Sequence, residues 1–167
     1  CKELSLDTKT VEKVHRAVLL SKTDLTTALV FEFTSLQGQI GKVYALLDGE
    51  DEEVADAIDL QYRPRFQGDI LPNNYVSIVV SLTEKIDNIF GSFSVGNIPK
   101  GSADPYALRR QAAAIVDILV ERQLHLDLLK VFKSIAGQYK NGDNLIEPIL
   151  EFINGRAKTF LYEKQFS

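Results

Sequence analysis

Two short basic stretches carry the side chains best suited to chemistry in this 167-residue chain. Arg63 and Arg65 flank a proline that stiffens an exposed turn and holds both guanidinium groups on it. Lys100 begins the second stretch, and Arg109 and Arg110 follow on the first turns of a predicted helix. Arginine's planar fork matches phosphate oxygens, and a helix N-terminus adds unpaired N–H groups and a favourable dipole. Both stretches are therefore candidate RNA-binding sites, with solvated or salt-bridged arginines as the alternative.

The two arginines of the second stretch should have different partners because of how their helix begins and where they lie on it. Asp104 is predicted to cap the helix, with Pro105 at the first position, where a missing N–H costs nothing. Tyr106 is expected to pack against the fold. Adjacent helix positions point about 100° apart, so the neighbouring arginines cannot both bind one phosphate. We expect one of them to pair with an internal carboxylate, for which Glu84 and Asp87 are the candidates.

Glu84 and Asp87 lie one helical turn apart, so their carboxylates share one face of a predicted helix. Acid–base catalysis could use such a pair. Lys85 lies between them and can pair nearby, which favours an internal polar cluster over a catalytic one.

No other group in the sequence supports catalysis or metal binding. A histidine-aspartate metal centre needs several ligands converging from different helices. The chain has two histidines, His15 and His125, and neither stands directly beside an aspartate. Cys1 is terminal, no serine lies in a Gly-x-Ser-x-Gly turn, and no phosphate-binding glycine pattern is present. We therefore predict no catalytic residue, no metal and no cofactor in this chain.

Charge and composition limit the function classes further. The formal net charge is −4, so any nucleic-acid contact must come from a local basic patch. A single cysteine excludes an internal disulfide and favours a reducing compartment. No apolar run approaches the roughly 20 residues that span a bilayer, and residues 1–30 lack the basic, apolar and small-residue zones of a signal peptide. We expect a cytoplasmic chain without a membrane partner, and Cys1 in place of methionine suggests a piece of a longer protein.

Apolar residues recur at helical spacing along almost the whole chain, and no segment sustains the period of two typical of a strand. Gly38 and Gly41 each cost their helix about 1 kcal/mol relative to alanine, which a close helix crossing would justify. Pro148 is tolerable only near the start of its helix. We predict a single all-α domain, residues 1–167, of seven or eight helices. They begin at Asp7-Thr8, at the capping-box forms 21–24 and 34–37, and near residues 51, 74, 104, 127 and 143.

Several long stretches occur in a characteristic order: "LLSKTDLTTALVFEFTSLQGQIGKVYA", "DGE", "YRPRFQGDILP" and "EKIDNIFGSFSVGNIPKGSADPYALRRQA". Together they resemble the middle of the beta subunit of bacterial glycyl-tRNA synthetase, over residues 19 to about 130. The tail after this stretch resembles the same family more loosely. Family members commonly have "ADK" where this chain has Thr83-Glu84-Lys85, and Glu84 keeps the negative charge there.

The resemblance implies a specific role. In this family the alpha subunit carries the active site that uses ATP and magnesium, and the beta subunit handles tRNA. The chain would be a non-catalytic, tRNA-contacting and scaffolding domain, inactive alone, with glycine-specific tRNA and the alpha subunit as partners. Contact with the acceptor arm of the tRNA is the expectation for its basic stretches. A purely structural brace within the beta subunit is the alternative.

The resemblance also implies a degenerate HD domain, an all-helical fold that has lost its metal site. Where an HD enzyme carries its His-Asp pair, this sequence reads "FEFTSLQG", without a histidine. Where that fold offers a late aspartate ligand, the sequence offers Glu84 and Asp87. A residual metal-dependent phosphohydrolase is thus a third and poorly supported alternative.

Overall fold

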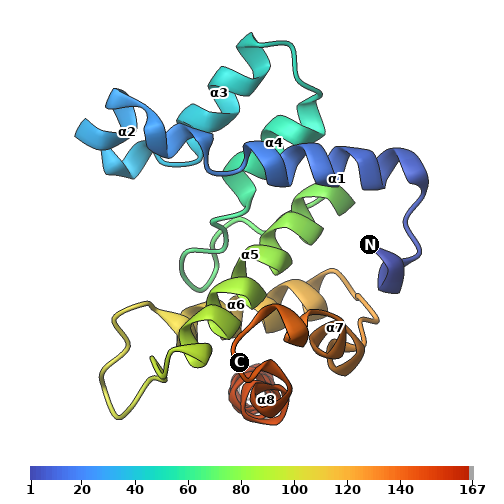
Figure 1. Cartoon of the computed structure of the whole chain (residues 1–167), viewed down its shortest axis with the longest axis vertical. Helices are drawn as coiled ribbons and strands as arrows, with labels where there is room; N and C mark the ends of the chain where they lie inside the picture. The colour runs from blue at the N-terminus through green and yellow to red at the C-terminus, as the bar shows by residue number, and fades with distance from the viewer. Residues whose placement is uncertain (166–167) are drawn as a thin grey trace. The chain divides into compact units, whose positions relative to one another are not determined.

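The structure, a computed structural model, describes residues 1–165 and confirms the all-α prediction (Figure 1). This part of the chain contains eight α-helices, four short 3-10 helices and no β-strand. The α-helices are α1 (Thr8–Leu20), α2 (Ala28–Glu32), α3 (Gln39–Leu47), α4 (Glu52–Leu60), α5 (Tyr75–Ser94), α6 (Leu108–Glu121), α7 (Leu128–Ile135) and α8 (Gly142–Gln165). The 3-10 helices are η1 (Lys2–Leu4), η2 (Thr23–Thr26), η3 (Thr34–Leu36) and η4 (Ala136–Gln138).

The chain divides into two compact units. The first unit is Cys1–Glu84, and the second begins at Lys85. Helix α5 therefore contributes its residues up to Glu84 to the first unit and the rest to the second. The organisation of residues 1–167 as one domain, and its likeness to a degenerate HD domain, stay predictions.

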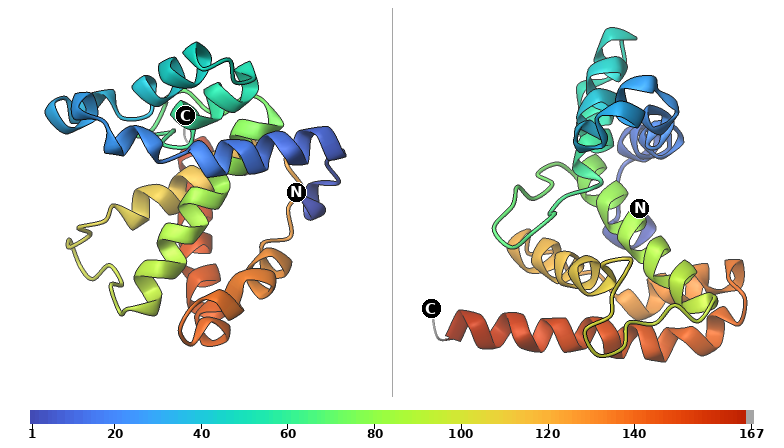
Figure 2. Two further views of the ribbon diagram at one scale, coloured as in Figure 1. Left: turned by 45° about the horizontal axis from the view of Figure 1, so that its top comes forward. Right: turned by 90° about the vertical axis from the view of Figure 1, so that its left-hand side faces the viewer.

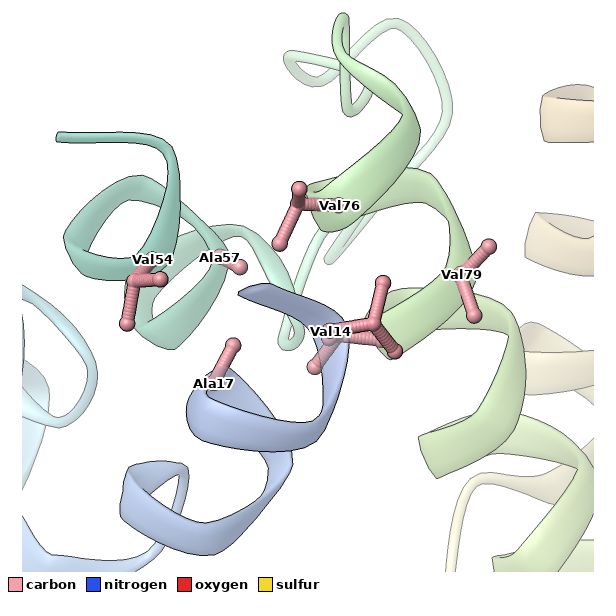
Figure 3. Packing of buried hydrophobic residues seen from close by; sticks show 7 residues of the cluster. Val14, Ala17, Val54, Ala57, Val76 and Val79 are labelled. Carbon is pink, nitrogen blue, oxygen red and sulfur yellow. The ribbon is translucent and has the colours of Figure 1, made fainter. Parts of the chain in front are cut away.

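The first unit buries a cluster of small apolar side chains between α1, α4 and the first half of α5. Figure 3 shows Val14 and Ala17 of α1 near Ala57 of α4 and Val76 of α5. Small and β-branched side chains let helix backbones approach closely, so α1 and α4 pack directly against each other (Figure 1). Asp7 and Asp51 cap these two helices by accepting hydrogen bonds from Thr10 N and Glu53 N, in agreement with the predicted helix starts.

The two glycines of the predicted third helix lie where neighbouring side chains leave no room for a Cβ atom. A Cβ on Gly41 would lie 2.6 Å from Cγ2 of Ile58, so α3 and α4 cross where residue 41 has no side chain. Gly38 has a φ of 84°, which ends any continuous helix from residue 34, and α3 begins only at Gln39. The prediction of a close crossing is confirmed, whereas the prediction of one helix opening at residue 34 is wrong.

The predicted capping box at residues 21–24 is also wrong. Ser21 is the C-terminal cap of α1, and its side chain donates to the carbonyl of Val18. Asp24 is buried, and its Oδ2 accepts a hydrogen bond from the N–H of Gly38 at 2.6 Å. The carboxylate satisfies a buried backbone donor far along the chain, because the tertiary fold places that donor against it.

The second unit has an aromatic core. The rings of Phe90 on α5 and Phe132 on α7 meet edge to face at 5.2 Å, and the ring of Tyr139 lies 5.1 Å from Phe90. Helix α6 buries Leu108, Ala112, Ile115 and Ile118 at helical spacing and packs along α8. Figure 2 shows α8 as one long continuous helix, although Pro148 lies in its second turn.

Candidate functional site

The loop between α5 and α6 is held in place by Asp104. Its Oδ1 accepts from Leu108 N at 2.8 Å, and its Oδ2 accepts from Arg109 N at 3.0 Å. Asp104 thus accepts hydrogen bonds from the first two N–H groups of α6, but the helix begins at Leu108 with Ala107 as its N-cap residue. The prediction of Asp104 as the N-cap and Pro105 as the first helical residue is wrong. The N-cap residue Ala107 has a φ of 53°, which turns the chain sharply into the helix.

Arg109 fastens this loop from the helix side. Its guanidinium donates to the carbonyl oxygens of Gly101 at 2.8 Å and Ala103 at 3.4 Å. Lys100 and Ala103 exchange backbone hydrogen bonds across the loop. The side chain of Gln111 donates to the carbonyl of Tyr106 at 3.1 Å. The predicted carboxylate partner of an arginine is thus replaced, for Arg109, by two loop carbonyls.

Three other side chains of this region project into solvent: Lys100, Tyr106 and Arg110. We call these three residues the loop face. Among the residues that the structure describes, none of the three side chains has an ion pair, hydrogen bond or ring contact. The expectation that Tyr106 packs is not met, since 54% of the residue is exposed. Its place in the sequence between Lys100 and Arg110 is the signal that could have marked it as a candidate for a binding surface.

The two arginines of the first basic stretch are bound by other residues of their own unit. The Arg63 guanidinium pairs with Asp69 at 3.0 Å and with Asp59 at 3.5 Å. Arg65 donates from its side chain to the carbonyl of Gln37 at 3.0 Å and from its backbone N–H to Asp69 at 2.7 Å. These arginines order the loop that follows α4.

The Asp69 carboxylate accepts hydrogen bonds from Arg63, Arg65 and Ile70 of that loop. Burial by itself would raise the pKa of the Asp69 carboxyl, but backbone N–H donors from Arg65 and Ile70 and the charge of Arg63 hold that pKa below 3.8, its ordinary value. A carboxyl whose pKa is lowered by folding stabilises the fold at neutral pH. That stabilisation is lost as the pH falls below 3.8.

The two acidic residues of α5 have separate partners. Glu84 accepts from the Lys22 ammonium at 2.6 Å within the first unit. Asp87 accepts a short hydrogen bond from the Tyr139 hydroxyl within the second unit. Burial and this bond to Asp87 both raise the pKa of Tyr139, which remains a neutral donor. A shared polar cluster of Glu84 and Asp87 stays a prediction.

The formal charge differs strongly between the two units. The first unit has 14 acidic and 8 basic residues, for a net charge of −6. The second has 9 acidic and 11 basic residues, for a net charge of +2. A polyanion would therefore be repelled by the first unit and attracted by the second, where the loop face lies.

A pocket of about 570 Å³ lies within the first unit. Three of its lining residues are acidic, and Glu50 is paired with the Arg16 guanidinium. The Oδ1 atom of Asp24 is buried without a hydrogen-bond partner in the part of the chain that the structure describes. The lining residues are Arg16, Leu20, Thr23, Asp24, Thr27, Gly41, Tyr44, Ala45, Leu47, Asp48, Glu50 and Ile58. None of them is a histidine, cysteine or serine, so the titratable groups of the pocket are its carboxylates, Arg16 and Tyr44.

Potential metal ligands do not converge in the described part of the chain. Within residues 1–165, no group of three or more His, Cys, Asp or Glu side chains is placed to hold a metal ion. His15 and His125 are both exposed. No helix in this range is long and apolar enough to cross a membrane.

The comparisons with known proteins agree on one family. Residues 1–167 match the family model described as "Glycyl-tRNA synthetase beta subunit". The chain is 47% identical over 155 residues to the glycine–tRNA ligase beta subunit of Pasteurella multocida (strain Pm70), covering 91% of this chain and 22% of that protein. It is 48% identical over 151 residues to the subunit of Actinobacillus succinogenes, and that match covers 89% of this chain and 22% of that protein. It is 47% identical over 160 residues to the subunit of Vibrio parahaemolyticus, and that match covers 94% of this chain and 23% of that protein.

The chain thus spans less than a quarter of the length of these curated relatives. The match nevertheless extends over 89–94% of this chain at 47–48% identity. The chain belongs to the glycyl-tRNA synthetase beta subunit family.

Proposed function

We propose that this chain is a tRNA-contacting and scaffolding part of a glycine–tRNA ligase beta subunit. In that role it supports the ATP-dependent attachment of glycine to its tRNA by an enzyme of alpha and beta subunits in the cytoplasm. The active site of the alpha subunit uses ATP and magnesium, and this chain supplies no catalytic group. The names of its relatives, all glycine–tRNA ligase beta subunits, support this assignment.

The observation that carries the tRNA contact is the loop face. Lys100 and Arg110 are exposed cations without a partner among the described residues, in a unit of net charge +2. Such side chains bind the phosphate oxygens of RNA through charge-assisted hydrogen bonds. Asp104 and Arg109 hold the loop, so little conformational entropy is lost when RNA binds.

The five predicted basic residues take different parts in this proposal. Lys100 and Arg110 bind phosphate, and Arg109 positions the loop. Arg63 and Arg65 order their own loop in the acidic first unit, so we assign them a smaller share of RNA binding.

A structural role within the beta subunit has its own supporting observation. Several large apolar side chains of the first unit are strongly exposed, including Leu19, Phe31 and Leu47. Where exposed apolar side chains form a contiguous patch they mark a surface that another polypeptide covers, so these residues are the candidates for such a contact. Scaffolding by the first unit is compatible with RNA contact by the second.

The proposal is tested by reversing the charge of the loop face in the assembled enzyme. For Lys100→Glu with Arg110→Glu we expect the KM for glycine tRNA to rise roughly 5- to 30-fold, as two exposed ionic contacts are worth roughly 0.5–1 kcal/mol each. The slope of log KM against log salt should become shallower by about 1 for each phosphate that the variant no longer neutralises.

The matched control is Lys133→Glu with Lys140→Glu, which makes the same change in net charge at two other exposed lysines of the second unit. This control should leave both the KM and the salt slope within about twofold of wild type. If the loop-face variant behaved like the control, the chain would not bind tRNA through Lys100 and Arg110.

A further inference from the structure

We infer that Tyr106 is a stacking platform for an unpaired nucleotide of the bound RNA, an inference that rests on the proposed function. More than half of this aromatic residue is open to solvent, at 54% exposure. Its hydroxyl has no hydrogen-bond partner and its ring has no aromatic partner among the residues that the structure describes. A tyrosine normally covers its ring and pairs its hydroxyl when the fold uses it for packing.

The backbone that carries this ring is fixed in place. The Tyr106 carbonyl accepts from the Gln111 side chain at 3.1 Å, and the next residue donates its N–H to the carbonyl of Asp104 at 3.1 Å. Ala107 holds a φ of 53°, a left-handed conformation that costs a non-glycine residue roughly 1–2 kcal/mol. An exposed ring on a restrained backbone can accept a flat ligand without first being ordered.

The exposed charges of the same loop and helix start point to a nucleic acid. Lys100 and Arg110 are the exposed cations of the same loop face, and Arg109 ties the residues after Lys100 to the start of α6. Aromatic side chains with neighbouring cations bind single-stranded nucleic acid by stacking on bases and pairing with phosphates. Phe31 is more exposed, at 81%, but it neighbours Glu32 in the unit of net charge −6, so the same argument does not extend to it.

The ligand must be an unpaired nucleotide. Bases in an A-form duplex are stacked on one another and offer only their edges, in a groove that side chains read by shape. A ring that stacks needs the face of a base, which is open in loops and single-stranded ends. Because every base has such a face, we expect little dependence on which base is bound.

The test uses the assembled alpha–beta enzyme with three variants at one position and two RNA probes. Tyr106→Ala and Tyr106→Leu remove the aromatic face, and Leu keeps apolar bulk so that a folding defect of the Ala variant is detected. Tyr106→Phe keeps the face and removes the hydroxyl. The probes are a glycine tRNA transcript and a blunt RNA duplex without unpaired nucleotides.

For the tRNA we expect the Ala and Leu variants to bind roughly 5- to 140-fold more weakly, the loss typical of one stacked base. The Phe variant should bind within twofold of wild type. Duplex binding should be unchanged in all three, and so should the salt slope for tRNA, because the ring carries no charge. A control at Tyr75→Ala, which removes a tyrosine of similar exposure (52%) in the first unit, should affect neither probe.

Failure of this inference is distinguishable from failure of the proposed function. If charge reversal at Lys100 and Arg110 weakens tRNA binding while Tyr106→Ala does not, the stacking inference is wrong and the proposed function stands. If neither affects binding, both are wrong. If Tyr106→Ala weakens association of the alpha and beta subunits but leaves tRNA binding by the assembled enzyme unchanged, the ring contacts protein and the inference is overturned.

Discussion

Replacing Phe90 by alanine is expected to lower the free energy of unfolding of this chain by about 3–5 kcal/mol. The Phe90 ring is completely buried and lies 5.2 Å from the ring of Phe132 and 5.1 Å from that of Tyr139. Truncation removes both ring contacts and leaves a cavity that α5 and α7 cannot close without moving. Urea unfolding of the 167-residue chain, followed by circular dichroism, measures the difference.

The matched control is Phe31→Ala, the same chemical change at a phenylalanine that is 81% exposed. We expect this control to change the free energy of unfolding by less than about 0.5 kcal/mol. Equal effects of the two substitutions would contradict the assignment of Phe90 to a packed aromatic core.

A second large effect is expected at the crossing of α3 and α4. In Gly41→Ala the new Cβ would lie 2.6 Å from Cγ2 of Ile58 and 3.2 Å from the Asp24 side chain. Overpacking of this kind costs about 1–3 kcal/mol, which outweighs or at least cancels the gain of roughly 1 kcal/mol in helix propensity. Thermal or urea unfolding should therefore show a net loss of up to about 2 kcal/mol.

Gly91→Ala tests the same substitution in α5 without the crossing. Nothing lies within 4 Å of a Cβ placed on Gly91, so only the propensity gain remains. We expect a stabilisation of roughly 0.5–1 kcal/mol. Destabilisation of similar size at both glycines would show that the contact of residue 41 with Ile58 is not what decides the result.

The parts of the fold that depend on local chemistry were predictable from the sequence. A helix was expected to begin near residue 74, and α5 forms over Tyr75–Ser94, because a long apolar run needs no distant partner to be recognised. Asp127 was expected to start a helix and does cap α7 by accepting from Lys130 N. Such caps depend on residues only three positions apart.

The sequence-based predictions were wrong where tertiary contacts or backbone turns override the local pattern. Asp24 has the spacing of a capping box but binds the N–H of Gly38, a contact 14 residues away that sequence spacing does not reveal. Asp104 was predicted to be the N-cap of α6, yet the turn at Ala107 delays the helix to Leu108, and Asp104 binds its first N–H groups from outside the helix. For the candidate site, residue types identified the basic stretches, but only the structure separates the ion-paired Arg63 from the exposed Arg110.

The most direct test of the account is chemical protection of Lys100 in the intact alpha–beta enzyme. Lysine acylation followed by mass spectrometry would compare the enzyme alone with the enzyme saturated with glycine tRNA. We expect tRNA to slow modification of Lys100 severalfold, while exposed Lys133 reacts at an unchanged rate. Equal reactivity of Lys100 with and without bound tRNA would contradict the claim that the loop face binds RNA.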